Sequence, residues 1–285
     1  MTNFKELEKK LDLILKAREE DIRLNYKDLY KRIRKDLERI YQKHEVKGQI
    51  NFDDLKKYKR LKTFDEKVAR YILFYYKTNE KLINNTMAEI VRDTRRESFE
   101  IINNKVSIAP IKKTYDIDKV INREVAGHLW GDRLKHQKNN FIYDVHGLIH
   151  EGLQNGNTYT QVAKNLSQKL GMDYSKTIRI ARTESARVQE TSKFDVMEEV
   201  NQEIKIVKVW RTMRDSAVRE THAAMEGQSV GFDEEFTLPS GATCLYPRMS
   251  GEASEDINCR CYLEYIPEKL LWYLKSLWAF LYKKI

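Results

Sequence analysis

The chain has 285 residues, of which 41% are hydrophobic and 33% are charged, a composition typical of a soluble globular protein with one large or two ordinary domains. No apolar run approaches the roughly 18 residues that a membrane-spanning helix needs, and the formal net charge is +9. Residues 1–150 hold 34 Lys and Arg against 24 Asp and Glu, whereas residues 151–285 hold 18 against 19. A basic first half favours a polyanionic partner, although a solvated Lys-rich surface would give the same count. The three cysteines form an odd set confined to residues 244–261, which argues against a secreted disulfide scaffold.

The first 109 residues contain no proline and only one glycine, Gly48, which favours long helices. Apolar residues recur at helical spacing between Ile22 and Ile40 and predict a first amphipathic helix. A turn is expected around Gly48, followed by a helix over about 55–75 and another over about 79–102. The sequence leaves open whether these helices form a bundle or an extended arm, and we treat residues 1–109 as one basic helical region.

A proline opens the second region. Residues 103–115 contain Pro110 and predict a linker, because proline lacks a backbone N–H and disfavours helix at the preceding residue. Residues 110–200 then form a helical middle region.

Two separate helices are expected in the middle region. Thr158 and Gln161 fit a capping box, with Thr158 as the N-cap. This helix is expected to end near Gly171 as its C′ residue, and the next to run from Ser175 to about Val200.

After residue 200 the hydrophobic pattern changes. Branched and aromatic residues over 204–210 predict a β-strand, and residues 215–225 predict a short helix capped by Asp215. Residues 201–267 therefore read as a small α+β module. Residues 268–285 predict an aromatic amphipathic helix that docks on a partner, lies at a membrane surface or closes the chain's own core. The expected fold class is mainly α, with helical N-terminal and middle regions and a small α+β C-terminal module.

The most distinctive residues lie in this module and on the helix before it. The helix carries Arg182-Thr183-Glu184 and the module closes on Asn258-Cys259-Arg260-Cys261, while the residues between them include Trp210, Asp215, Arg219, His222 and Gly227. Together these residues resemble the phage head-morphogenesis family, the Mu F-like minor head proteins of tailed bacteriophages. The resemblance covers residues from about 116 to about 267.

The resemblance implies a non-enzymatic minor head protein of the virion interior, assembled in the host cytoplasm with portal, scaffold or capsid proteins. In some phages such proteins leave with the DNA on ejection. It also implies that the basic helices face packaged double-stranded DNA and that the C-terminal module and tail dock on protein. Two alternatives stay open. A nuclease or transferase would need clustered carboxylates or a nucleotide pocket, and a membrane-active ejected protein would use the tail.

Basic side chains on two predicted helices are the candidate DNA contacts. They would neutralise phosphates without reading base sequence, since no DNA-recognition motif accompanies them. The candidate residues are Lys56, Lys57, Lys59, Arg60, Lys62, Arg92, Arg95 and Arg96.

His222, Cys244, Cys259 and Cys261 are candidate zinc ligands, because tetrahedral zinc takes thiolates and imidazoles. The Cys-x-Cys spacing is tighter than the usual Cys-x2-Cys and favours the alternative that Cys259 and Cys261 are small buried residues on a final strand. Some family relatives carry Cys-Pro-x-Cys at the position of residues 219–222, where only His222 could be a ligand here.

Two further groups are expected to be structural rather than catalytic. Asp215, Arg219 and His222 predict a polar network, since no nucleophile accompanies an Asp–His pair. Residues 182–184 predict a brace between helix and strand, with Glu184 placed three residues before Arg187 for an ion pair.

Overall fold

The computed structural model describes residues 3–57, 59–109, 115–125 and 127–270. Four long helices dominate: α1 (Phe4–His44), α3 (Arg60–Asn103), α5 (Trp130–Gln154) and α6 (Tyr159–Glu203). Shorter helices are α2 (Phe52–Lys57), α4 (Ile117–Ile121), α7 (Glu220–Ala223) and α8 (Ala253–Asp256). The strands lie near the C-terminus, apart from one small hairpin, so the expected fold class is confirmed.

The chain folds into two compact units, and neither is a single stretch of sequence. The first is built from Met1–Leu15, Asn85–Leu129 and Arg182–Ile285, and the second from Lys16–Asn84 and Trp130–Ala181. The boundaries expected after residues 109, 200 and 267 stay a prediction made from sequence order.

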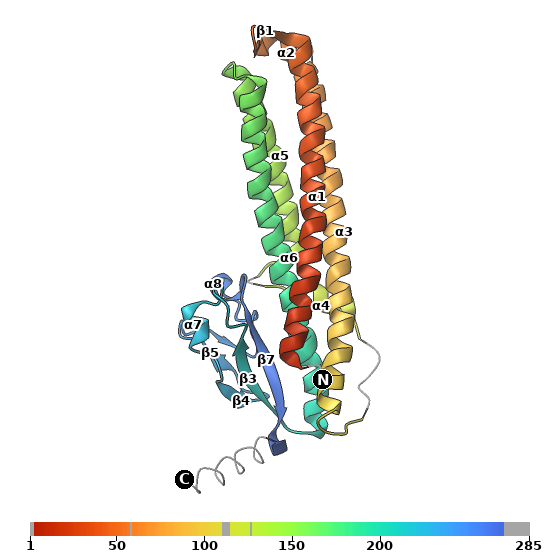
Figure 1. Ribbon diagram of the computed structural model, residues 1–285, viewed down its shortest axis with the longest axis vertical. Coiled ribbons are helices and arrows are strands. Elements are labelled where there is room, and N and C mark those ends of the chain that lie inside the picture. Colours follow the sequence, from red (N-terminus) through yellow and green to blue (C-terminus); the bar gives the residue numbers. More distant parts are fainter. Residues whose placement is uncertain (1–2, 58, 110–114, 126, 271–285) are drawn as a thin grey trace. The chain divides into compact units, whose positions relative to one another are not determined.

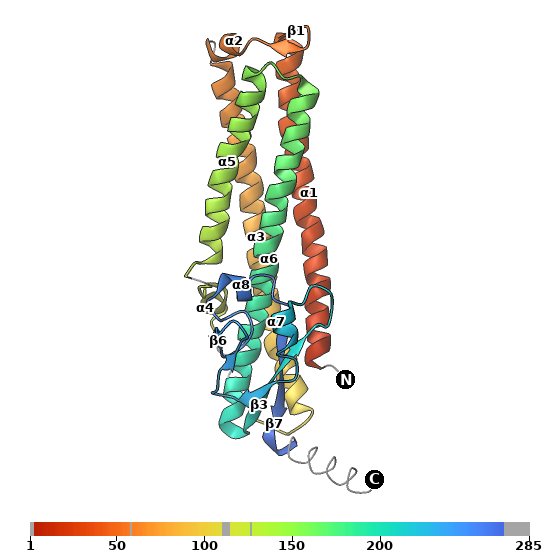
Figure 2. The same ribbon diagram turned by 90° about the vertical axis from the view of Figure 1, so that its left-hand side faces the viewer.

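The second unit is helical. Its parts of α1, α3 and α6 lie side by side with α5 (Figures 1 and 2). The predicted apolar stripe of the first helix faces the core, with Ile22, Leu29 and Ile33 each at most 1% exposed. A buried polar cluster sits among these helices. Its carboxylate belongs to Asp173, which accepts hydrogen bonds from the hydroxyl of Tyr26 at 2.6 Å and that of Tyr76 at 2.5 Å.

The predicted turn and the predicted capping box of this unit are both present. The hairpin β1 (Glu45–Val46) and β2 (Gln49–Ile50) closes through Lys47 and Gly48, whose φ angles are +56° and +80°. Gly48 suits this left-handed conformation because it has no Cβ. The capping box is confirmed as well, since Gln161 N donates to Thr158 Oγ1 at 3.4 Å and Thr158 N donates to Gln161 Oε1 at 2.8 Å.

Two predicted helix breaks are wrong. The helices expected over 55–75 and 79–102 are largely one, α3, which passes through Asn79 without interruption. The buried Asn79 accepts a hydrogen bond from Asn25 at 2.7 Å, so a tertiary partner satisfies this weak helix former. Likewise α6 continues through Gly171 and Ser175, and the Ser175 hydroxyl donates back to the Gly171 carbonyl at 3.0 Å.

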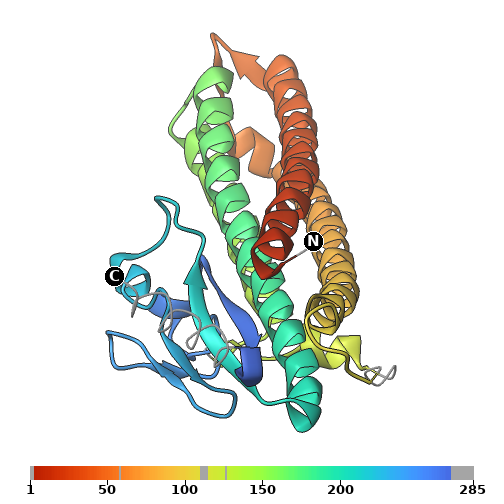
Figure 3. The ribbon, with the colours of Figure 1, turned by 60° about the horizontal axis from the view of Figure 1, so that its bottom comes forward.

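The first unit contains the predicted α+β module. Its main sheet has the order β4-β3-β7, all antiparallel, with β3 (Ile206–Thr212) between β4 (Ser229–Gly231) and β7 (Cys261–Pro267). A second hairpin pairs β5 (Phe236–Thr237) with β6 (Thr243–Cys244). The C-terminal part of α6 lies along the main sheet (Figure 3). Phe194 of α6 stacks on Phe232 with ring centroids 4.7 Å apart, which anchors the helix to the module.

Two expectations fall on residues outside the described part. Pro110 of the predicted linker is one, and residues 271–285 of the aromatic tail are the other. In the part of the chain that the structure describes, no helix combines the length and apolar character needed to cross a bilayer.

Candidate functional site

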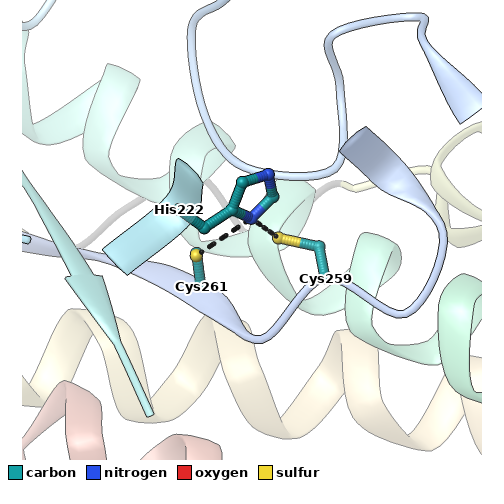
Figure 4. A group of neighbouring side chains, drawn as sticks. All are labelled: His222, Cys259 and Cys261. Carbon is teal, nitrogen blue, oxygen red and sulfur yellow. Dashed lines mark hydrogen bonds between the residues drawn. The ribbon is translucent and has the colours of Figure 1, made fainter. Parts of the chain in front are cut away.

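A histidine and two thiols meet where α7 faces the start of β7. His222 Nδ1 lies 3.5 Å from Cys259 Sγ and 3.4 Å from Cys261 Sγ (Figure 4). All three side chains are buried, and their ligand atoms lie within 4.8 Å of one another. Backbone geometry explains the convergence. Cys261 is the first residue of β7 and Cys259 lies two positions before it, the spacing at which side chains along a strand point to the same side.

The second ring nitrogen of His222 contacts a carboxylate. His222 Nε2 lies 2.6 Å from Glu255 Oε2, and the Trp210 ring packs nearly perpendicular to the imidazole with a centroid distance of 6.2 Å. Burial alone would lower the pKa of His222, but its contacts with Cys259 and Glu255 raise that pKa above the usual value. The hydrogen bond from Cys261 holds the pKa of Cys259 well below its ordinary range.

Cys244, the fourth predicted ligand, is outside this group of converging atoms. It is buried on β6 in the same apolar core, and burial raises the pKa of its thiol to about 12. A fully desolvated thiol of this kind behaves as a small apolar residue.

The Arg-Thr-Glu segment braces the first unit from within. Thr183 Oγ1 accepts a hydrogen bond from Asn258 N at 3.3 Å, which joins α6 to the loop before β7. Glu184 accepts from Arg187 Nε at 2.8 Å, and both side chains are 0% exposed. The same Arg187 donates to the carbonyls of Val120 and Ile121 at the end of α4. This segment thus connects α6 to α4 and to the loop, and the predicted pair with Arg187 is present.

Arg219 and Asp215 of the module also form hydrogen bonds with backbone groups. Arg219 donates to the carbonyls of Glu255 and Ile257, which fixes the loop that carries Cys259. Asp215 was expected to cap a helix, but α7 begins only at Glu220 with Arg219 as its N-cap residue. Asp215 instead accepts from Ala217 N in a turn and pairs with Arg260.

Gly227 and Asn258 supply two left-handed positions next to these residues. Their φ angles are +83° and +55°, and Gly227 N donates to the carbonyl of Trp210 at 2.8 Å. Asn is among the few residues with a Cβ that tolerate this conformation.

A buried charge cluster behind β7 was not predicted from the sequence. Lys193 donates to Glu8 at 2.6 Å and pairs with Glu190, while Arg248 lies 3.4 Å from Glu190. Arg248 also donates to the carbonyl of Cys259 at 3.0 Å. Glu8 and Lys193 are 185 positions apart in the sequence, and only the fold brings them together.

The candidate DNA contacts differ in exposure. Lys56, Lys59 and Lys62 are exposed at the α2–α3 junction, and Arg60 NH1 lies 3.3 Å from His44 Nδ1. The side chain of Lys57 lies outside the described part of the structure.

The second predicted basic group is largely used within the protein. Arg95 is only 8% exposed, pairs with Glu199 and covers the Tyr115 ring at 3.5 Å, so it is not available to a phosphate. Arg96 is exposed but pairs with Asp93, and Arg92 is exposed.

The helical unit has a basic hollow that the sequence did not predict. It has a volume of about 290 Å³ and lies between α5 and α6. Basic side chains at its wall are those of Arg133, Lys169, Lys176 and Arg179. Lys169 pairs with Asp144 across it at 2.5 Å. A charge count along the chain could not have located this hollow. Arg133 lies near the end of the basic first half, whereas Lys169, Lys176 and Arg179 lie within residues 151–285, which carry almost no net charge.

The fold and the module define a mainly helical protein with a small Cys/His-containing α+β unit. Residues 143–264 match the family described as Phage Mu protein F like protein. This stretch is similar to the phage Mu F-like head proteins, the family that the sequence motifs predicted.

Two characterised relatives are similar to the chain. It is 24% identical over 267 residues to the minor head protein GP7 of Bacillus phage SPP1, a match that covers 93% of this chain and 87% of that protein. It is 36% identical over 146 residues to the NAD(+)–arginine ADP-ribosyltransferase EFV of Enterococcus faecalis, covering 51% of this chain but 30% of the transferase. No solved structure matches the chain.

Proposed function

We propose that this chain is a minor head protein placed with the portal inside the capsid, where it binds packaged double-stranded DNA without sequence preference and leaves with it on ejection. The observation that carries the proposal is the similarity to the SPP1 minor head protein GP7, which extends over 93% of the chain. A match of that extent supports a shared role for the whole protein rather than for one module.

The geometry of the family residues supports binding and placement without turnover. Arg187, Arg219 and Arg248 each donate to backbone carbonyls, so their charges hold loops in position. A rigid surface made in this way suits assembly with portal, scaffold or capsid proteins.

The helical unit provides the expected DNA contacts. Exposed Lys56, Lys59 and Lys62 lie on it, and so does the basic hollow that includes Lys176 and Arg179. Side chains of this kind neutralise phosphates and release counterions, so binding should weaken steeply with salt.

DNA binding by the full chain, measured against salt concentration with Mg²⁺ present, tests this proposal. Each lost phosphate contact should lower the slope of log K against log salt by about 0.9. The triple variant Lys56→Gln/Lys59→Gln/Lys62→Gln is therefore expected to lower it by roughly 2–3. The matched control replaces exposed Lys105, Lys119 and Lys205 of the other unit. No binding, or the same slope in both variants, would refute the DNA role. Cleavage of the DNA would refute the non-enzymatic role.

Arginine ADP-ribosyl transfer is a second candidate, favoured by the 36% identity to the enterococcal transferase over half of this chain. Because the match covers 30% of that transferase, the shared part need not carry its activity. Incubation with NAD⁺ and an arginine-containing acceptor separates the candidates. Release of nicotinamide coupled to labelling of the acceptor would establish the transferase, and we expect neither.

A membrane role would rest on the aromatic tail. Flotation of liposomes with the full chain and with a chain ending at residue 267 tests it directly. Flotation that needs residues 268–285 would favour a membrane-active ejected protein, whereas loss of head assembly without any flotation would favour docking on a protein partner.

A further inference from the structure

We propose that His222, Cys259 and Cys261 bind a zinc ion through Nδ1 and the two Sγ atoms. The proposal rests on geometry in the first unit and is independent of DNA binding. The three side chains converge from α7 and the start of β7, and their ligand atoms lie within 4.8 Å of one another.

The spacing of the ligand atoms fits tetrahedral coordination. Zinc binds sulfur at about 2.3 Å and imidazole nitrogen at about 2.0–2.1 Å, so tetrahedral angles separate a nitrogen and a sulfur ligand by roughly 3.5 Å. The observed separations from His222 Nδ1 are 3.5 Å to Cys259 and 3.4 Å to Cys261. Both distances match at the same nitrogen.

The hydrogen bond to Glu255 leaves Nδ1 as the ring nitrogen that faces the sulfurs. His222 Nε2 lies 2.6 Å from Glu255, so an imidazole that donates there presents its lone pair at Nδ1. Both sulfurs lie at nearly equal distances from this nitrogen. A cation placed between the three atoms would have all three as ligands.

The surroundings match those of protein zinc sites. A histidine ligand usually donates its other ring N–H to a carboxylate, which fixes the tautomer and orients the ring, as Glu255 does here. The perpendicular Trp210 ring further restricts the imidazole. Two thiolates and one divalent ion carry no net charge, so a buried site of this composition avoids an unpaired charge.

The tight Cys-x-Cys spacing is no obstacle, because Cys261 opens β7 and both sulfurs lie within 3.5 Å of the same imidazole nitrogen. Alternate residues of an extended chain point to one side, so a single intervening residue suffices. Arg260 at that position points away and pairs with Asp12 and Asp215. Three protein ligands leave one tetrahedral position for a further ligand.

Metal analysis of the full chain tests the proposal. Protein purified with zinc in the medium is expected to contain about one zinc per chain by mass spectrometry. Replacement by Co²⁺ should give thiolate-to-cobalt charge-transfer absorption and intense tetrahedral d–d bands. Cys259→Ser and Cys261→Ser are expected to lose both. Cys244→Ser, which changes a buried thiol outside the ligand group, should retain them.

Two further measurements keep the test decisive if a ligand variant fails to fold. Removal of metal from the wild-type chain with a strong chelator should lower its thermal midpoint, and added zinc should restore it. Glu255→Gln should weaken zinc affinity by roughly 10- to 100-fold while keeping the thiolate bands, whereas Glu252→Gln, an exposed neighbour, should not. Wild-type protein that contains no zinc, shows no cobalt–thiolate bands and is unaffected by the chelator would overturn the proposal.

Discussion

At the scale of single residues, the buried charges behind β7 make stability depend on pH. Glu190 is 0% exposed and shares Lys193 with Glu8. Burial raises the pKa of Glu190 to about 7, and the nearby Glu8 charge adds to the effect while Lys193 opposes it. The folded protein therefore holds a proton on Glu190 over a range in which the unfolded chain has released it.

Glu190→Gln is expected to flatten the pH profile of the unfolding free energy. In the wild-type chain the folded pKa is raised from 4.5, so the contribution of Glu190 is present below about pH 4.5 and is lost as pH rises through about 7. Glutamine does not titrate, so its variant should lack this decline. Urea unfolding at a series of pH values from 4 to 8 measures it. Glu198→Gln, exposed on the same helix, should keep the wild-type decline, and an unchanged slope in Glu190→Gln would contradict the assignment.

At the scale of elements, the continuity of α6 places Gly171 inside a helix and not at its end. Gly171 lies in the helix interior, and a Cβ there would meet nothing within 4 Å. Gly171→Ala is expected to stabilise the protein by about 0.5–1 kcal/mol, because alanine loses less backbone freedom on folding. The comparison is Gly156→Ala in the preceding turn, where φ is +68° and alanine should destabilise. Denaturant unfolding distinguishes them, and destabilisation by both variants would place a helix end at Gly171.

Local patterns predicted the elements well, whereas their continuity depends on tertiary partners. The stripe from Ile22 and the capping box at Thr158 are signals contained within a few turns, and both are present. The break predicted after Gly171 is wrong because contacts with other helices, which a local pattern does not show, keep α6 continuous there. Asp173, two residues on, is a weak helix former, but the hydroxyls of Tyr26 and Tyr76 from other helices hold its carboxylate in the core.

The candidate site shows the same division. Cys-x-Cys and a preceding histidine are visible in the sequence, and His222, Cys259 and Cys261 do converge. Cys244 lies outside the ligand group, and Glu255 contacts His222, because of how the segment between β4 and β7 folds. No rule of sequence spacing specifies that path. Arg95 shows how a sequence signal can mislead. Its charge suggested a phosphate contact, but its guanidinium group pairs with Glu199 and stacks on the Tyr115 ring.

At the scale of the whole molecule, the two compact units interleave along the chain. Each takes residues from both sides of position 150, which itself lies inside α5. The uneven charge suggested a basic N-terminal half with its own role. A fragment of residues 1–150 would lack the α6 part of both units, so its binding to DNA would report its charge and not a native surface.

We therefore expect residues 1–150 not to fold alone. Without α6, the apolar faces of α1 and α3 in the helical unit lose a partner, so the fragment should show no cooperative thermal transition by circular dichroism. The matched experiment divides the chain in the turn between Asn155 and Gly156, which leaves α5 and α6 whole. These two fragments should associate when co-expressed and regain a cooperative transition that neither shows alone. Cooperative unfolding of residues 1–150 by themselves would instead mean that the N-terminal helices form a self-sufficient bundle, and the portion of the chain that binds DNA would then have to be sought within it.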